Sequence, residues 1–544
     1  MASSPAETDV VVHVETPPRS VGATLRRLGP GLIVAASIVG SGELIATTKA
    51  GAQAGFWLLW LIVVGCIIKV FVQIEFGRNA IHSGKTTMDA LSQVPGPRWR
   101  GRGNWIVWYW FVMFMGSLGQ LGGIVGSVGQ ALAISVPLTE HGREFNDFAN
   151  AAIGLKSARA ALRSAELSQI APDRLARLRT KVRQWEEELE RLSLSWRGRI
   201  GDARFQELGN RPPPPLDDKI WAAVIAVVTS WLLFRGRYRF IQWFSTLLVG
   251  SFTAITLINL GLLQIDPIWH VTWQDLANGM SFRTPPGKQG FDAVMTALAT
   301  FGIIGVGASE LVVYPYWCLE KGYAKFTGPF DDSPTWYERA RGWLRVMQWD
   351  SWCSMVIYTL ATVAFYLLGA AILGRSQLDP QSNELIRTLS AMYEPVFGDW
   401  ATVLFLFGSF AVLYSTFFVA NASHARVLSD TLGVLGLARR DDHSGSRRIR
   451  LLSALFPLVC LGIYVTIPRP AQLVLLGGLL QAIMLPMLAA AGLYFRYGCT
   501  PKPLRPGRIW DLFLWISALG MVVAGGTALV LKFQELLAWI GVAN

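Results

Sequence analysis

The chain has 544 residues, of which 52% are hydrophobic and only 16% are charged. With a mean hydropathy of +0.37, this composition is too apolar for a soluble globular protein. The net charge of +12 comes mainly from Arg and Lys between apolar runs, which orientation in a bilayer explains without a nucleic-acid partner. The sequence therefore predicts a multi-pass membrane protein whose first partner is the lipid bilayer.

Apolar runs recur along the chain at lengths close to those that a bilayer requires. About eleven runs lie at 30–49, 55–80, 104–136, 219–235, 240–263, 293–318, 347–374, 399–425, 450–467, 471–495 and 509–532. Residues 1–28 precede them and are expected to form a disordered cytoplasmic tail. The five cysteines share no ligand-type spacing, so we expect small buried hydrophobic residues rather than disulfides or a zinc site.

Basic residues concentrate in every second loop between these runs. They follow the second, fourth, sixth, eighth and tenth runs and include Lys85, Arg98, Arg235, Lys321, Arg339, Arg439, Lys502 and Arg508. Short loops rich in Lys and Arg stay on the cytoplasmic side of a membrane. The pattern places the N-terminus in the cytoplasm and the protein in the cell (inner) membrane.

One long polar segment, residues 137–217, separates the membrane region 29–136 from the membrane region 218–544. Within it, apolar residues alternate spacings of three and four, which is a heptad pattern: Leu175, Leu178, Val182, Trp185, Leu189, Leu192 and Trp196. Pro172 begins this helix and an Ala-rich stretch precedes it, so we expect two antiparallel helices outside the cytoplasm over residues 150–207. We interpret the hairpin as a solvated structural arm, with an extracytoplasmic binding partner as the alternative.

Two glutamates follow small residues inside apolar runs, where a helix should otherwise continue. The first stretch is Gly40-Ser41-Gly42-Glu43, and the second, about half the chain later, is Gly307-Ala308-Ser309-Glu310. Interrupted apolar segments at corresponding places in two halves indicate a transporter with a binding site at the membrane midplane. The alternative is that each Glu favours the positive end of a restarting helix and binds nothing.

Two further polar residues lie deep in apolar runs. Lys69, in the second run, is expected to pair structurally or to neutralise a carboxylate of the site, and Gln481, in the tenth, could line the site. We expect the two breaks to face each other, because irregular backbone at membrane depth must be buried or line a cavity.

Several stretches resemble the Nramp family of divalent metal transporters over most of residues 28–532. They include Gly29-Pro30-Gly31, Ser83-Gly84-Lys85-Thr86, Asp350, Gly369 to Leu373, Tyr414-Ser415-Thr416 and Leu485-Pro486. The resemblance implies an all-α fold of the LeuT type, an inverted repeat of five plus five helices with an eleventh added, and the hairpin as an insertion.

The signature residues of that family are replaced in this chain. Where the family has Asp-Pro-Gly-Asn, Gly40 takes the place of the ligand Asp and Glu43 that of the ligand Asn. Where it has Met-Pro-His, this chain has Ala308-Ser309-Glu310, and the place of a second His falls near Pro315. The pattern is similar to the divergent Nramp-related branch that includes magnesium transporters.

These replacements change the expected substrate. Carboxylate and carbonyl oxygens favour Mg²⁺, Ca²⁺ and Mn²⁺, whereas a thioether favours softer metals. Mg²⁺ keeps several of its waters when bound, and Ala308 leaves room for them. We therefore expect transport of a divalent cation, Mg²⁺ before Mn²⁺, by alternating access and without proton coupling, because both family histidines are absent.

Other functions remain open from the sequence. A LeuT-type transporter of amino acids or other organic solutes also fits a Gly-Ser-Gly break, and a receptor or scaffold built on the hairpin fits less well. No nucleophile and base are paired in a way that predicts an enzyme, and no cofactor is expected, since the metal is substrate.

Overall fold

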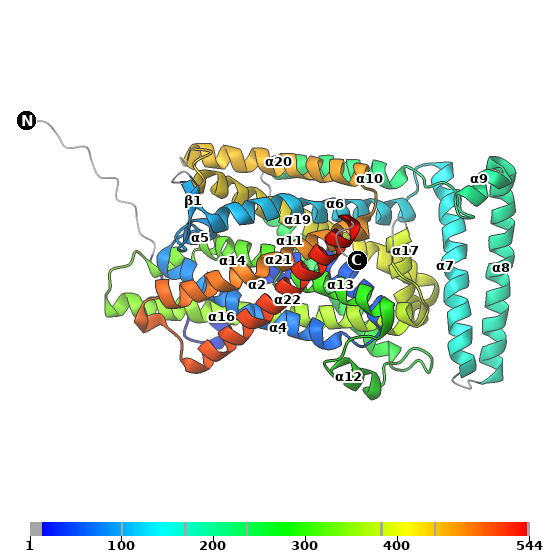
Figure 1. The fold of residues 1–544 in the computed structure, drawn as a ribbon, viewed down its shortest axis with the longest axis horizontal. Coiled ribbons are helices and arrows are strands. Elements are labelled where there is room, and N and C mark those ends of the chain that lie inside the picture. Colours follow the sequence, from blue (N-terminus) through cyan, green and yellow to red (C-terminus); the bar gives the residue numbers. More distant parts are fainter. Residues whose placement is uncertain are drawn as a thin grey trace, which may run out of the picture.

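The computed structural model describes residues 14–99, 102–167, 171–235, 238–380, 384–439 and 442–540. The fold is helical almost throughout, which confirms the predicted all-α membrane class. In the described part of the chain, eight helices are long and apolar enough to cross a membrane. Figure 1 shows the long helices lying side by side across the picture as a single bundle.

All the apolar runs fold as helices, but two of them are interrupted. The first run divides into α2 (Pro30–Ile38), the π-helix η1 (Gly42–Thr47) and α3 (Thr48–Ala54), and the sixth into α13 (Gly287–Ile303) and α14 (Ala308–Lys321). The other runs correspond to α4 (Leu59–Ser83), α6 (Trp105–Ser135), α10 (Asp217–Arg235), α11 (Tyr238–Leu263), α16 (Pro334–Leu368) with its π-helical end η2 (Gly369–Gly374), α19 (Ala401–Val434), α20 (Asp442–Thr466), α21 (Pro470–Tyr494) and α22 (Arg508–Ile540).

Three of the expected runs are not among the eight spanning helices. The first is cut into short pieces, and α10 begins with the charged residues Asp217, Asp218 and Lys219. In α11 the stretch counted as apolar is the shorter Val249–Leu263. These runs still lie within the bundle, since α10 packs against α6 and α20 while α11 packs against α19.

Short elements connect the long helices. They are α1 (Val21–Arg27), α5 (Thr87–Leu91), α9 (Asp202–Glu207), α12 (Trp273–Gly279), α15 (Tyr323–Thr327), α17 (Leu385–Ser390), η4 (Ala391–Tyr393), α18 (Glu394–Phe397), η5 (Gly398–Trp400), η6 (Phe495–Cys499) and η7 (Lys502–Leu504). The strands β1 (Arg98–Trp99) and β2 (Arg102–Asn104) pair antiparallel and were not expected from the sequence.

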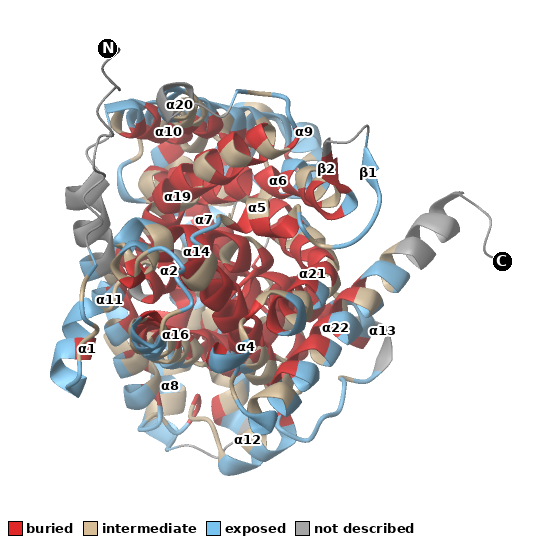
Figure 2. Cartoon of the chain, turned by 90° about the vertical axis from the view of Figure 1, so that its left-hand side faces the viewer, coloured by how far each residue is buried: buried red, intermediate tan, exposed pale blue. Residues whose placement is uncertain are grey.

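Apolar side chains occupy both the inside and the perimeter of the bundle. Figure 2 shows the buried residues concentrated along its centre. On the perimeter, α10 exposes Val227 and Trp231, and α22 exposes Val522 and Val523. Exposed apolar side chains on long helices are typical of a surface that faces lipid rather than water.

The 137–217 segment contains two long helices, α7 (Glu140–Leu167) and α8 (Pro172–Ile200). Ion pairs Arg159–Glu186, Arg179–Glu166 and Arg199–Glu144 join them, and this pairing requires the two helices to run antiparallel. Trp185 of the heptad pattern lies over Gly154, where the position of an added Cβ would be 2.7 Å from the Trp185 ring. The first helix begins ten residues earlier than expected, at Glu140.

The hairpin does not stand free of the bundle, so the expectation of a solvated arm is wrong for α7. In Figure 1, α7 and α8 stand at the right-hand end of the bundle, transverse to its helices. The α7 residues Ala149, Ala151 and Ile153 are buried, and α7 packs against α17. The physical reason is that the small, apolar face of α7 is covered by the loops of the bundle rather than by α8 alone.

Residues 14–28, expected to belong to a disordered tail, also have a defined structure; the rest of that predicted tail, residues 1–13, lies outside the described residues. The Trp343 indole donates to the carbonyl of Glu15, and the Glu15 N–H donates to the carbonyl of Phe326. Pro17 packs closely over Gly342, and α1 follows. Contacts with α16, distant in sequence, order this segment.

Close helix packing supplies a test of the bundle. At Gly51 in α3, an added Cβ would lie 2.4 Å from the carbonyl oxygen of Tyr366, whereas at Gly462 in α20 nothing lies within 4 Å. Gly462→Ala should stabilise the protein by about 0.5–1 kcal/mol through helix propensity. Gly51→Ala should instead destabilise it by about 1–3 kcal/mol through overpacking. Thermal unfolding in detergent measures both variants, and an equal rise in Tm for the two would contradict the packing.

Candidate functional site

The first helix break lies at Val39 and Gly40. Helix α2 ends at Ile38, and the chain resumes as η1 at Gly42. An added Cβ at Gly40 would lie 2.0 Å from the Thr416 hydroxyl oxygen of α19, so only glycine fits here. The break expected near Gly40–Gly42 is confirmed, and a neighbouring helix approaches it so closely that a side chain at Gly40 is excluded.

The second break covers residues 304–307. Helix α13 ends at Ile303, Gly305 has a φ of +55°, and α14 begins at Ala308. Glycine adopts such a positive φ without steric cost. An added Cβ at Gly305 would lie 3.0 Å from the Cα of Cys66 in α4, so this turn is also pressed against a neighbouring helix.

Glu43 joins the two breaks. Its side chain is buried, and Oε2 accepts a hydrogen bond from the Gly40 N–H at 3.3 Å while Oε1 accepts from the Gly305 N–H at 3.4 Å. The Thr362 hydroxyl of α16 also donates to Oε1 at 3.4 Å. These contacts confirm that the breaks face each other. All three bonds are long, so the carboxylate is held loosely.

Lys69 satisfies backbone groups at the second break. Its ammonium is buried and donates to the carbonyl of Phe301 at 2.7 Å and to that of Ile304 at 2.5 Å. The last carbonyls of a helix have no partner within it, and inside a bilayer water cannot supply one. The structural role expected for Lys69 is therefore the one its contacts show, although Lys69 also lies within electrostatic range of Glu43 and Glu310.

Glu310 starts the helix after the second break. Its Oε2 would lie 2.4 Å from a Cβ added to Gly307, so the carboxylate folds back over that glycine. Glu310 is close enough to Glu43 for the two carboxylates to interact electrostatically. Ala308 beside it is fully buried. Both glutamates therefore reach the same region from the two broken helices.

A chain of hydrogen bonds crosses the centre of the bundle. The Ser309 N–H donates to Gln481 Oε1 at 3.0 Å, and Gln481 Nε2 donates to Gln120 Oε1 at 2.6 Å. Gln120 Nε2 in turn donates to the Ser41 hydroxyl at 3.2 Å. This chain links α14, α21 and α6 to Ser41 at the first break. Gln481 therefore lies beside the second break, and its predicted place in a binding site stays a prediction.

Three polar residues at these breaks were not expected there from the sequence: Thr362, Gln120 and Thr416, the last of which was noted only for its family resemblance. Each lies in an apolar helix, where a hydroxyl or amide side chain often bonds within its own helix and gives no sequence signal. Gln120 carries the clearest available signal, since an amide side chain inside a membrane span is costly without a partner.

The donor set at the breaks is made of oxygen atoms. The carbonyls of Gly40 and Gly307 accept the first amides of the restarting helices, from Leu44 at 2.8 Å and from Leu311 at 2.9 Å. A carbonyl oxygen has a second lone pair, which remains available. No group of three or more His, Cys, Asp or Glu side chains suited to a metal ion occurs within the described ranges. A cation here would combine two carboxylates with carbonyl, hydroxyl and water oxygens.

Comparison with known proteins gives a family match over more than half of the chain. The model of the family described as Natural resistance-associated macrophage protein-like, Nramp, matches residues 214–531. A divalent metal cation transporter, MntH, of Caldanaerobacter subterraneus subsp. tengcongensis is 24% identical over 115 residues, 21% of this chain and 26% of the relative. Metal transporter Nramp2 of Oryza sativa subsp. japonica is 30% identical over 112 residues, 20% of each chain. The aligned region thus spans about a quarter and a fifth of these relatives.

The fold is shared more widely than the sequence. A crystal structure of the Eremococcus coleocola manganese transporter superposes with a TM-score of 0.55, covering 98% of this chain and 97% of that one at 14% identity. A second structure of that transporter, with one substitution, gives a TM-score of 0.56 at 13% identity. At such identity the likeness shows the fold alone. It supports the LeuT-type class, and the five-plus-five inverted repeat stays a prediction.

The role of Lys69 can be tested by removing its ammonium. Lys69→Met should destabilise the protein by about 1–3 kcal/mol, because the Phe301 and Ile304 carbonyls lose their donor inside the bilayer. Lys69→Gln should destabilise it less, since an amide retains a donor. Thermal unfolding compares the two variants, with Lys85→Met, an exposed lysine outside the bundle, as the control. If the Tm of Lys69→Met were unchanged, the stability of the protein would not depend on the hydrogen bonds from Lys69 to the Phe301 and Ile304 carbonyls.

Proposed function

The chain belongs to the Nramp family, and on that premise we propose that it moves divalent metal cations across the cell (inner) membrane by alternating access. Family membership also fits the expectation that the chain is a membrane transporter and not an enzyme. The cation is substrate, so we propose no resident cofactor. The N-terminus is proposed to lie in the cytoplasm, which puts the α7–α8 hairpin on the other side.

One observation carries this proposal. The buried Glu43 carboxylate touches both helix breaks at once, through the N–H groups of Gly40 and Gly305. Burying a carboxylate at membrane depth costs free energy, so its presence there indicates either a function or strong structural hydrogen bonds. Its three long hydrogen bonds are not a firm bond, so the side chain can turn toward a cation that enters between the breaks.

The proposed binding residues are those predicted from the sequence. Glu43 and Glu310 supply negative charge, and the surroundings are formed by Gly40, Ser41, Gly42, Gly307, Ala308 and Ser309, with Gln481 and Lys69 behind them. We propose that Mg²⁺ is preferred, because this set is rich in oxygen and a hydrated ion needs only a few protein ligands.

Mn²⁺ is the second candidate, because a buried cysteine packs against the second break. A Cβ added at Gly305 would lie 3.0 Å from the Cα of Cys66, and Cys66 is fully buried. A sulfur atom favours a softer ion than Mg²⁺. Comparing the uptake of Mg²⁺ with that of Mn²⁺ measures whether the oxygen ligands or this thiol decides the preference.

We propose transport driven by the membrane potential and not by coupled protons. His424 packs edge-on against the ring of Phe114, at a centroid distance of 5.1 Å, and His82 lies in the last turn of α4. Neither of these positions, for His424 or for His82, is at the two helix breaks. An amino acid or another organic solute remains the alternative substrate, and its carboxylate would have to approach two glutamates.

Removing one charge at a time tests the site. Glu43→Gln and Glu310→Gln keep the size of the side chain and remove its charge, and at position 43 the amide oxygen can still accept from one of the two backbone N–H groups. Both proteins should fold while Mg²⁺ affinity falls about 10- to 100-fold. Uptake of Mg²⁺ and Mn²⁺ into proteoliposomes is the measurement. Glu188→Gln, on the exposed side of α8, is the matched control and should transport normally. If both site variants took up Mg²⁺ and Mn²⁺ as the parent does, the two glutamates would only stabilise the helix starts. That result would favour the organic solute as substrate.

The selectivity proposal predicts the effect of sulfur at position 308. Ala308→Met should shift the ratio of Mn²⁺ to Mg²⁺ uptake about tenfold or less toward Mn²⁺, because a thioether prefers the softer ion. Ala308→Leu adds a side chain of similar volume without sulfur and controls for crowding at this buried position. An equal change in the two variants would show that volume, and not ligand softness, sets the ratio.

A further inference from the structure

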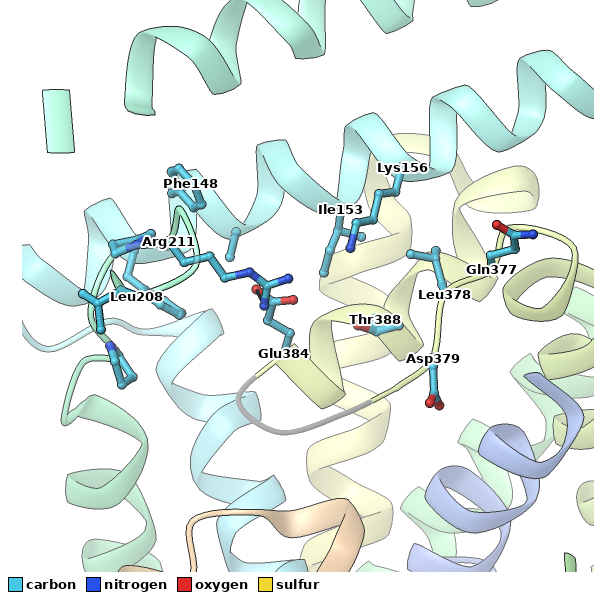
Figure 3. A pocket seen from close by; sticks show the side chains of 14 residues that line it. Phe148, Ile153, Lys156, Leu208, Arg211, Gln377, Leu378, Asp379, Glu384 and Thr388 are labelled. Atoms are coloured by element: carbon cyan, nitrogen blue, oxygen red, sulfur yellow. Dashed lines mark hydrogen bonds and ion pairs between the residues drawn. The ribbon is translucent and has the colours of Figure 1, made fainter. Parts of the chain in front are cut away.

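A cavity of about 470 Å³ lies between the hairpin and the bundle. Figure 3 shows its walls, formed by α7 with Lys156, by the return of the hairpin with Arg211, and by the loop that follows η2. Asp379 belongs to this loop, and its carboxylate points away from the hairpin. The cavity therefore ends at the seam between that loop and the first span.

The seam is closed by backbone packing. Gly51 of α3 lies against the carbonyl of Tyr366, and an added Cβ at Gly369 would lie 2.4 Å from the carbonyl oxygen of Thr48. Helix α3 thus lies directly on the end of α16 and on η2. Glu43 is on the same broken span, six residues before Lys49, or roughly 9 Å along the axis of a helix.

Polar side chains of α3 bind the loop after η2 where this seam meets the cavity. Lys49 is buried, its ammonium donates to Asp379 Oδ1, and it also donates to the carbonyl of Pro380 at 3.1 Å. Gln53 Nε2 donates to Asp379 Oδ2 at 3.1 Å, and the Thr296 hydroxyl of α13 donates to Gln53 Oε1 at 2.7 Å. One carboxylate therefore ties together both broken helices and the loop after η2.

The hairpin contacts α17 and α18, the helices that come next along the chain after that loop. Arg387 of α17 donates to Asn150 and, at 2.6 Å, to Asn146 Oδ1, both on α7. Burial lowers the pKa of Arg387 to about 10, so it stays charged at neutral pH and keeps its need for these acceptors. Arg211 pairs with Glu384 at 3.4 Å. Farther along, Lys181 of α8 pairs with Glu394 at 2.6 Å.

We propose that the Lys49–Asp379 ion pair is the gate at the hairpin end of the transport path, and that the α7–α8 hairpin braces this gate closed. The inference rests on the proposed function for the site it guards. Opening requires α3 to separate from η2, which breaks the ion pair. The hairpin slows this separation because it holds α17, the helix that comes next along the chain after the loop that carries Asp379. The insertion therefore sets the gating equilibrium of a transporter instead of serving as a passive arm.

Access to the native Cys66 reports on the gate without any cation. Cys66 is buried beside Gly305, so a thiol reagent reaches it only when a path to the breaks opens. A full-length protein with its other cysteines replaced by serine is treated with a small methanethiosulfonate, and modification of Cys66 is followed by mass spectrometry. Lys49→Met should raise the modification rate about fivefold or more. Lys49→Arg, which keeps the charge, should stay near the parent rate.

The brace is tested by a matched pair of arginines. Arg387→Met breaks the contact of the hairpin with the bundle, whereas Arg199→Met breaks the Arg199–Glu144 pair within the hairpin. Arg387→Met should raise Cys66 modification, and Arg199→Met should not. Arg211→Ala, at a more exposed contact with Glu384, provides a milder second variant should Arg387→Met fail to fold.

Each result separates the parts of the proposal. An unchanged rate in folded Lys49→Met protein would overturn the gate. A raised rate in Lys49→Met with the parent rate in Arg387→Met and Arg211→Ala would overturn the brace. Because the readout needs no metal, it is independent of the uptake measurements that test Glu43 and Glu310, and the gate and the proposed substrate can fail separately.

Discussion

The bundle depends on satisfying the backbone groups that two broken helices leave inside the membrane. Water cannot serve those groups at that depth, so each break requires side chains as partners. Glu43 accepts from the amides of Gly40 and Gly305, while Lys69 donates to the carbonyls of Phe301 and Ile304. A carboxylate and an ammonium, both costly in a bilayer, are thereby placed where their charge meets the opposite ends of the backbone dipoles.

The same principle anchors the N-terminal half of the first span at the end of the bundle opposite the hairpin. The Asp350 carboxylate accepts the Gly29 N–H at 2.9 Å and also the Gly31 N–H, at the start of α2. The Tyr314 hydroxyl of α14 donates to Asp350 at 3.3 Å, so one acid holds both broken spans there. With Lys49 and Asp379 at the other end, polar contacts close the region around Glu43 from both sides.

The hairpin gives this architecture an element that a compact transporter does not need. It adds no ligand to the breaks, yet it contacts α17 and α18 through Asn146, Arg211 and Lys181, which pair with Arg387, Glu384 and Glu394. An insertion attached at such helices can change how often a site opens without changing what the site binds. Under the two proposals, selectivity is set by residues at the helix breaks and gating by residues at the hairpin end.

The sequence by itself determined the features whose cause is local. Apolar runs predicted the helices, Gly-rich stretches before Glu43 and Glu310 predicted the breaks, and Pro172 predicted the start of α8. It did not determine the partners of the polar residues, because those partners are set by where helices cross. Lys49 and Asp379 are 330 residues apart, and Gln120 and Gln481 are 361 apart. The docking of α7 and the order of residues 14–28 were likewise decided by surfaces that exist only once the bundle is assembled.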